Sequence, residues 1–193
     1  MSVRMNELRA VLRQGTQAAH QRLDARMSTL PLDRRPSYSR FLHVQAAALV
    51  PLEIALEQAG VVYLLPDWTW RTRRAALLAD IRQMDGEEAP MPGPQEQPVD
   101  WIESPAAMIG ATYVLEGSRL GGAMLRKQVM AAEDPVIRLA SRFLNHGNGE
   151  NLWLSYNDTL KNARLDEAER AVMVDSAVRS FALFETAAPE AGS

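Results

Sequence analysis

A histidine near the start of the chain stands between two side chains that are able to orient its ring. Thr16, His20 and Asp24 are spaced four residues apart, so on a helix they lie along one face. A neutral imidazole is a common metal ligand, and a carboxylate that accepts its second N–H fixes the tautomer. The same pattern also suits a helix histidine that is merely hydrogen-bonded. We expect His43 to be a satisfied core imidazole in an apolar segment, and His146 to face solvent in a Gly/Asn turn.

A second segment combines a strong helical pattern with three glycines. It runs from Tyr113 to Gly122, and Gly117, Gly121 and Gly122 each cost a helix interior roughly 1 kcal/mol relative to alanine. Small residues four apart allow two helices to pack closely, which is one explanation. Three glycines within six positions also leave the backbone without side chains and permit a bend. Such a backbone suits close approach to a flat group, and with the imidazole it predicts a haem slot.

The spacing of apolar residues predicts helices along most of the chain and negligible strand content. Ser104-Pro105 and Asp134-Pro135 each supply an N-cap followed by a proline that suits a first helical turn. The predicted helices cover Glu7 to Met27, Pro36 to Gly60 with a bend at Pro51, Trp68 to Met84, Pro105 to about Ala132, Val136 to Asn145, Glu150 to Ala163 and Asp166 to Ala187.

The helix from Trp68 to Met84 is predicted to be amphipathic. We expect its exposed side to carry Arg71, Arg73 and Arg74.

The length of 193 residues permits one domain with a full-sized core, and 47% of the residues are apolar. We therefore expect a single domain over residues 1–193. The stretch 85–103 is rich in proline and glycine, so it is predicted to be a surface loop. Residues 189–193 are predicted to be a disordered tail.

Composition excludes several kinds of function. The formal net charge of −3 without a long basic block argues against a nucleic-acid surface. Without cysteine, the chain has no disulfides, thiolate metal sites or cysteine nucleophiles of its own. The longest apolar run, Val44 to Leu56, is interrupted by polar residues and proline, and the N-terminus lacks a secretory signal pattern. We therefore expect a cytoplasmic protein that does not cross a membrane.

The two segments together resemble the bacterial haem oxygenases, including those encoded beside bacteriophytochromes. Leu12 to His20 is similar to the proximal helix of that family, and Tyr113 to Gly122 is similar to its distal helix. Asn151 to Tyr156 and Ser180 to Glu185 are weaker matches. The resemblance covers most of the chain. It implies an all-α, single-domain fold with haem between the first, proximal helix and the glycine-bent distal helix.

The resemblance also implies roles for individual residues. His20 is expected to bind the haem iron, while Asp24, or a water held by Asp24 and Thr16, accepts its other N–H. Arg13 and Tyr113 are expected at the haem propionates or edge. The expected haem contacts are Arg13, Thr16, His20, Asp24, Tyr113, Gly117, Gly121, Gly122 and Phe184, and the expected catalytic residues are His20, Gly117, Ser118 and Gly121.

Ser118 departs from the pattern of the animal members. They carry an aspartate there, which orders the distal water. The Ser118 hydroxyl orders one water instead, or it bonds back to its own helix, and both alternatives stay open. Phe184 likewise is either a haem-edge contact or an ordinary core residue.

The activity implied is oxygen-dependent cleavage of haem to biliverdin, with release of ferrous iron and carbon monoxide. The chain shows no G-x-G-x-x-G pattern and no P-loop, so a separate ferredoxin or reductase is expected to supply electrons. Arg126 and Lys127 are expected on a solvated helix face and docking patch, and a bacteriophytochrome is an expected recipient of biliverdin. Two other hypotheses stay open: a haem carrier or sensor without catalysis, and a helical interaction protein that binds no haem.

Overall fold

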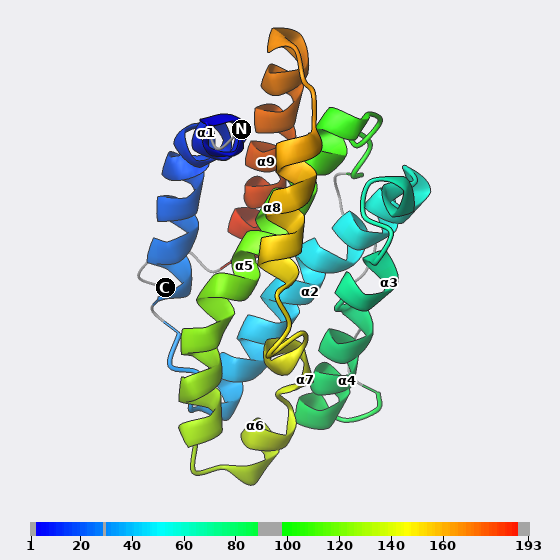
Figure 1. Cartoon of the computed structure of the whole chain (residues 1–193). Coiled ribbons are helices and arrows are strands. Elements are labelled where there is room, and N and C mark those ends of the chain that lie inside the picture. The colour runs from blue at the N-terminus through cyan, green and yellow to red at the C-terminus, as the bar shows by residue number, and fades with distance from the viewer. Residues whose placement is uncertain (1–2, 29, 89–97, 189–193) are drawn as a thin grey trace.

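The computed structural model describes residues 3–28, 30–88 and 98–188. Within these ranges the chain is helical and contains no strand (Figure 1), so the expected all-α class is confirmed. No helix in the described ranges is long and apolar enough to cross a bilayer. The elements are α1 (Val3–Met27), α2 (Arg35–Gln58), the 3-10 turn η1 (Val61–Tyr63), α3 (Trp68–Arg71), α4 (Arg74–Asp85), α5 (Pro105–Ala131), α6 (Pro135–Leu139), α7 (Arg142–Asn145), α8 (Leu152–Asn162) and α9 (Glu167–Ala187).

Three of the described helices, α5, α6 and α9, begin at an N-cap residue whose own side chain accepts a backbone N–H of the first turn. The Ser104 hydroxyl accepts the Ala107 N–H at 3.2 Å at the start of α5, and the Asp134 carboxylate caps α6. At the start of α9, Asp166 and Glu169 accept each other's backbone N–H at 2.9 and 2.8 Å, which is a capping box. The predicted starts at Ser-Pro and Asp-Pro are therefore confirmed.

The helix predicted from Trp68 to Met84 is in fact two helices. Thr72, which follows α3, is extended, with φ −65° and ψ 137°. The buried carboxylate of Glu53 on α2 then accepts the N–H groups of Arg73 and Arg74 at 2.7 and 3.1 Å. The single-helix prediction is wrong because the group that caps α4 comes from a distant segment.

The same break reverses the expected exposure of two arginines. Arg71 is only 2% exposed and Arg73 only 5%, while Arg74 is half-buried and pairs with Glu57 at 2.8 Å. The prediction of an exposed basic face is therefore wrong. The extended residue between α3 and α4 lets the first two side chains turn inward, where carboxylates and carbonyl oxygens accept their N–H groups.

The helix predicted from Val136 to Asn145 is also divided, into α6 and α7. At the break, the Tyr38 hydroxyl donates to the Ala140 carbonyl oxygen at 2.5 Å. The Asp80 carboxylate, which is fully buried, accepts the Phe143 N–H at 2.8 Å and caps α7. Both partners come from other helices, so no local pattern indicates the break.

The remaining boundaries lie within two residues of the predictions, except that α1 begins at Val3 rather than at Glu7. α2 continues through Pro51 and ends before Gly60, whose φ is 84°. In the predicted loop, residues 86–88 and 98–103 are not helical. Residues 89–97 of that loop and the predicted tail 189–193 lie outside the described residues.

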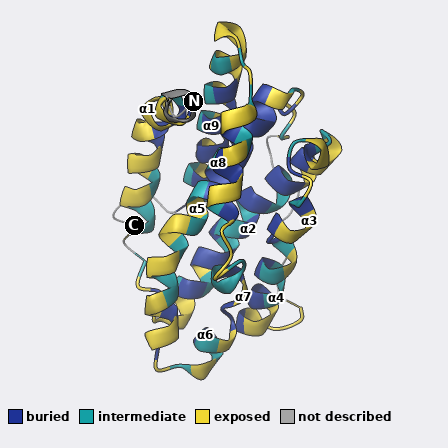
Figure 2. Cartoon of the chain, in the orientation of Figure 1, coloured by how far each residue is buried: buried dark blue, intermediate teal, exposed yellow. Residues whose placement is uncertain are grey.

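α9 lies at the centre of the bundle, because α5, α1 and α2 all pack against it. Buried residues follow the faces that these helices turn toward one another (Figure 2). A Cβ at Gly15 of α1 would lie 2.5 Å from Val174 Cγ1, and a Cβ at Gly110 of α5 would overlap the Met173 carbonyl oxygen. Since Met173 and Val174 are neighbours, α1 and α5 both approach α9 closely at one level. We call Gly15, Gly110, Met173 and Val174 the glycine belt.

Candidate haem site

His20 projects from α1 with one ring nitrogen already engaged. Its side chain is 60% exposed, and Nδ1 lies 2.9 Å from Asp24 Oδ2, one turn further along. Among the described residues, Nε2 has no hydrogen-bond partner. Phe181 of α9 packs edge-on against the imidazole, with ring centroids 5.7 Å apart. The imidazole is thus oriented through one nitrogen and open at the other, which fits the needs of a haem-iron ligand.

The glycine segment of α5 is surrounded by little besides its own backbone. A Cβ at Gly121 would meet nothing within 4 Å. A Cβ at Gly117 would only touch Trp153 at 3.9 Å, and one at Gly122 would only touch Leu144 at 3.9 Å. Close helix packing, one of the two explanations for these glycines, therefore describes Gly110 of the belt but not this segment.

Two apolar side chains beside the bare backbone are exposed. Leu120 is 56% exposed and Met124 is 70% exposed. Apolar side chains that share one exposed helix region with bare backbone indicate a binding surface. An apolar macrocycle fits that surface.

α1 and α5 come together one turn away from His20. Thr16, Arg9 and Arg13 lie close enough to the Tyr113 hydroxyl to oppose the rise in its pKa that burial causes. From that contact α1 and α5 run in the same direction (Figure 1). His20 follows Thr16 by one turn on α1, and Gly117 follows Tyr113 by one turn on α5. His20 and the glycine segment therefore lie at neighbouring levels of two adjacent helices.

Cationic side chains gather at this meeting point. Arg13 is exposed and has no hydrogen-bond or ion-pair partner in the part of the chain that the structure describes. The Arg9 guanidinium lies 5.4 Å from the centroid of the Trp153 ring. Thr16 is buried and donates its hydroxyl to the Leu12 carbonyl oxygen at 2.7 Å, so of the two flanking polar side chains only Asp24 bonds to the imidazole. Two arginines at one end of the surface suit the carboxylates of a ligand.

The Ser118 hydroxyl is engaged on both sides. It donates to the Leu115 carbonyl oxygen at 2.8 Å and accepts from Arg73 Nη2 at 2.9 Å. Of the two alternatives for Ser118, the structure shows the bond back to its own helix. The Arg73 guanidinium packs 5.0 Å from the centroid of the Phe143 ring. Burial and the neighbouring Arg119 lower the pKa of Arg73 to about 10, so a positive charge remains beside Ser118 at neutral pH.

Aromatic residues of α9 divide between the site and the core. Phe184, the expected haem-edge contact, is 3% exposed. Phe181 is the ring that contacts His20. No contact with the site was predicted for it from the sequence. It lies in the segment Ser180 to Glu185, so the resemblance of that segment was the available signal. Arg73 was also missed, because nothing in its neighbourhood along the chain indicates burial.

The other two histidines are engaged elsewhere. His43 Nε2 lies 2.8 Å from Asp85 Oδ2, so the ring is satisfied as expected, although it is partly exposed. His146 is half-buried, and its Nδ1 lies 3.3 Å from Arg119 Nη1. Burial, Arg119 and Arg73 lower the pKa of His146. The prediction that His146 faces solvent is wrong because the turn after α7 folds against α5.

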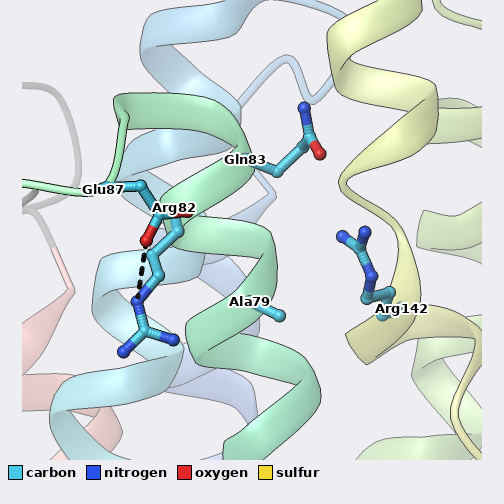
Figure 3. Close-up of a pocket in the computed structure, with 5 residues that line it drawn as sticks. All are labelled: Ala79, Arg82, Gln83, Glu87 and Arg142. Carbon is cyan, nitrogen blue, oxygen red and sulfur yellow. Dashed lines mark ion pairs between the residues drawn. The ribbon is translucent and has the colours of Figure 1, made fainter.

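A separate hollow of about 350 Å³ lies between α4 and α7 (Figure 3). Arg82 pairs with Glu87 at 3.9 Å, and Arg142 pairs with Asp80 at 3.2 Å. The hollow is lined by Ala79, Arg82, Gln83, Glu87 and Arg142. Its polar lining does not suit an apolar macrocycle, and it shares no residue with the surface around His20.

An all-helical bundle with an oriented, open imidazole and a glycine segment free of close contacts is the arrangement expected of a helical haem protein. Comparison with known proteins narrows this class. The heme oxygenase family model matches residues 6–190. The chain therefore belongs to the heme oxygenase family and is a haem oxygenase, an enzyme that degrades haem to biliverdin.

Individual relatives cover nearly the whole chain. Heme oxygenase PigA of Pseudomonas aeruginosa is 28% identical over 172 residues, which are 88% of this chain and 85% of PigA. The NO- and CO-bound heme oxygenase of Neisseria meningitidis has a TM-score of 0.73 at 22% identity, covering 94% of this chain and 96% of that one. The haem complex of heme oxygenase-1 from the cyanobacterium Synechocystis has a TM-score of 0.71 at 16% identity, covering 93% and 90%. These two structures share the fold of this chain.

Proposed function

We propose that this haem oxygenase binds its substrate between α1 and the glycine segment of α5, with His20 as the ligand of the iron. The observation that carries this placement is the His20 imidazole, which is tied to Asp24 through Nδ1 and open at Nε2. The substrate brings the iron that binds and activates dioxygen. The protein supplies orientation, steric bias and hydrogen bonds.

On the proximal side, His20 Nε2 would bind the iron. The Asp24 carboxylate accepts the Nδ1–H, which selects the tautomer with a free Nε2 lone pair and raises the basicity of the ring. Phe181 restricts rotation of the imidazole by contact with its face. Asp24 and Phe181 together hold the ring before the substrate enters.

On the distal side, Gly117 and Gly121 leave room for dioxygen above the iron. Because neither carries a side chain, the backbone itself limits where the bound oxygen points, and Gly122 extends the same surface. The Ser118 proton is already donated to the Leu115 carbonyl oxygen. Ser118 therefore has no free O–H to donate in this arrangement, and an ordered water is needed for proton delivery.

At the end where α1 and α5 meet, Arg13 and Tyr113 would bind the propionates. A guanidinium and a phenol there fix which edge of the macrocycle faces the glycine backbone. Phe184 stays in the core in this structure, so its proposed contribution is to support Phe181 one turn earlier on α9.

The electrons would come from a separate ferredoxin or reductase. Arg126 and Lys127 on α5 are the proposed docking patch for an acidic donor. Delivery of biliverdin to a bacteriophytochrome and a cytoplasmic location are part of the same proposal. The resemblance of the sequence motifs supports the first of these.

The competing function is a haem carrier or sensor that has the slot without the chemistry. Titration of the purified protein with haemin should give a Soret band that saturates at one haem per chain. Addition of a reductant under air should then bleach that band and produce a biliverdin spectrum. A stable Soret band under these conditions would assign the chain to the carrier class, and no binding at all would leave a helical interaction protein.

The His20→Ala variant tests the ligand directly. It should lose the imidazole-ligated spectrum and turnover, because the pocket remains while the ligand is gone. Added imidazole should restore both in part. His43→Ala is the control, since His43 pairs with Asp85 away from α5. A normal spectrum in His20→Ala together with an altered one in His43→Ala would show that His20 is not the ligand.

A further inference from the structure

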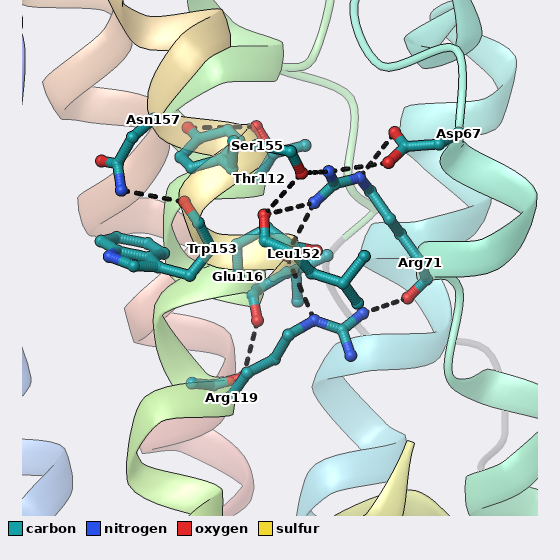
Figure 4. Close-up of polar contacts among 12 residues, drawn as sticks. Asp67, Arg71, Thr112, Glu116, Arg119, Leu152, Trp153, Ser155 and Asn157 are labelled. Carbon is teal, nitrogen blue, oxygen red and sulfur yellow. Dashed lines mark hydrogen bonds and ion pairs between the residues drawn. The ribbon is translucent and has the colours of Figure 1, made fainter. Parts of the chain in front are cut away.

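Two arginines and a glutamate form a buried charged group behind the glycine segment (Figure 4). Glu116, the residue before Gly117, is 1% exposed. Its Oε2 accepts from Arg71 Nη1 at 2.9 Å and lies 3.2 Å from Arg119 Nε. We call Arg71, Glu116 and Arg119 the charged triad. It has no role in the site described above.

Arg71 links the triad to three other points of the fold. Its Nε and Nη2 donate to the two Asp67 oxygens at 2.7 and 2.8 Å. Nη1 also donates to the Leu152 carbonyl oxygen at 3.1 Å, and Nη2 also donates to the Ser155 hydroxyl at 2.5 Å. With Glu116, these contacts use all five N–H groups of the guanidinium. Arg71 is therefore fixed by α3 and α8 independently of α5.

Arg119 anchors the other end of the triad. Its Nη2 donates to the carbonyl oxygen of Arg71, and its Nη1 donates to the carbonyl oxygen of His146 at 3.3 Å. Glu116 and Arg119 are three residues apart, so both lie on the same face of α5. That face is held to α3, to α8 through Arg71, and to the turn after α7.

The glycine segment itself offers few contacts that fix its orientation. Gly121 lies about five residues beyond Glu116, on roughly the opposite side of the helix. A Cβ there would meet nothing within 4 Å. The face of α5 that carries Gly121 has no close contacts. The rotation of residues 117–122 about the helix axis therefore depends on the contacts of the opposite face, which carries Glu116 and Arg119. Directional hydrogen bonds from Arg71 to Glu116, and from Arg119 to the carbonyl oxygens of Arg71 and His146, restrict such rotation more than apolar contacts do.

A buried charged group of this kind is weak evidence for stability, because desolvation offsets most of the attraction. Its better-attested effect is to select one arrangement of the elements that it joins. We propose that Glu116 is a positioning residue: held by Arg71 and Arg119, it fixes the rotation of residues 117–122 and so the direction in which their backbone faces the haem. This inference rests on the proposed function, since the haem must lie on the glycine face.

Glu116→Gln tests the inference without changing the size of the side chain. In the haem-free protein, amide hydrogen exchange of residues 117–122 should become faster by on the order of tenfold, relative to amides of α9. Glu57→Gln is the control, because Glu57 binds two side chains, Trp68 and Arg74, and no hydrogen bond or ion pair among the described residues links any of the three to α5. The control should accelerate exchange near the start of α4 and leave residues 117–122 unchanged relative to α9.

The haem-loaded variants supply the second readout. Glu116→Gln should broaden the mixture of biliverdin isomers, while Glu57→Gln should give the wild-type pattern. Unchanged exchange in residues 117–122 of Glu116→Gln would overturn the inference whatever the products are. Selective loosening of these residues with an unchanged isomer pattern would also overturn it, by showing that their rotation does not direct cleavage. Failure of the proposed function differs from both, since the wild-type protein would then not bind haem.

If Glu116→Gln does not fold, Arg119→Gln replaces it. Removal of Arg119 leaves Glu116 paired with Arg71, whereas loss of the Glu116 carboxylate leaves Arg119 without an ion-pair partner. The same selective increase in exchange and the same broadened products are expected. Wild-type values of both in a folded Arg119→Gln would overturn the inference.

Discussion

Gly110 and Gly121 belong to the same helix, and alanine should affect stability in opposite ways at the two positions. At Gly121 the new methyl group meets nothing within 4 Å. The only effect on the haem-free fold is then the gain in helix propensity. At Gly110 the methyl group would overlap the Met173 carbonyl oxygen of α9. The backbones of α5 and α9 must move apart to accept it.

The magnitudes follow from these two environments. Gly121→Ala should stabilise the haem-free protein by about 1 kcal/mol, which for a chain of this size raises Tm by roughly 2–4 °C. Gly110→Ala gains the same propensity but adds an overpacking cost of about 1–3 kcal/mol or more. The two variants should therefore differ by at least that overpacking cost.

The assay is urea unfolding of the haem-free variants, followed by turnover of haem. Gly121→Leu extends the series, because its larger side chain should reach the space for dioxygen while the helix keeps its gain in propensity. We expect that variant to be folded and slow, and to release an altered mixture of biliverdin isomers.

A lowered urea midpoint in Gly121→Ala would refute the reasoning, because it would mean that residue 121 packs against other groups in solution. Normal turnover in Gly121→Leu together with a strong loss of stability would assign the glycines to helix packing instead.

Two further predictions concern charged groups. Arg13→Ala should weaken haem binding only several-fold, about 1–2 kcal/mol at most for a partly exposed ion pair, but should broaden the mixture of biliverdin isomers, which chromatography resolves. If affinity and isomers are both unchanged, Arg13 lies outside the site and Arg126, Lys127 or Arg179 must be tested. His146 binds its proton less tightly in the folded than in the unfolded protein, so the stability it contributes is present above the unfolded pKa of about 6.5 and is lost as the pH falls below it. His146→Gln should therefore flatten the decline of the urea midpoint between about pH 7 and about pH 5, and an equal decline in both proteins would contradict this assignment.

The helices were predictable because their signals are local. Ser104-Pro105 and Asp166 with Glu169 specify helix starts from within one turn, and the structure has caps at both places. The all-helical class follows from apolar spacing alone. The expected site also depends on local spacing, because Thr16, His20 and Asp24 share a face on any helix.

The breaks and the buried arginines were not predictable from local patterns. Glu53 caps α4 from another helix, and Tyr38 binds the carbonyl oxygen at the end of α6 across a large sequence separation. In sequence, Arg71 and Arg73 fit the exposed face of one helix. In the structure the extended residue Thr72 separates them, and acceptors on other helices hold both side chains inward. Burial of a charge is decided by its partners, and apart from Asp67, four residues before Arg71, those partners lie outside any window along the chain.

At the glycine belt α1 packs directly against α9, so a tilt of α1 would turn about this level. At the belt α1 touches α9 through Gly15 and Val174, where no side chain on α1 separates the two backbones. With a rise of about 1.5 Å per residue, His20 lies about 7 Å from this level and Met27 about 18 Å from it. A tilt of about 10° then displaces the His20 backbone by roughly 1 Å but the far end of α1 by roughly 3 Å. Beyond His20, Arg22 and Arg26 of α1 bind Glu185 of α9. A tilt of α1 that admits a flat substrate would therefore have to break these bonds, while the contact at the belt and the place of the imidazole would change little.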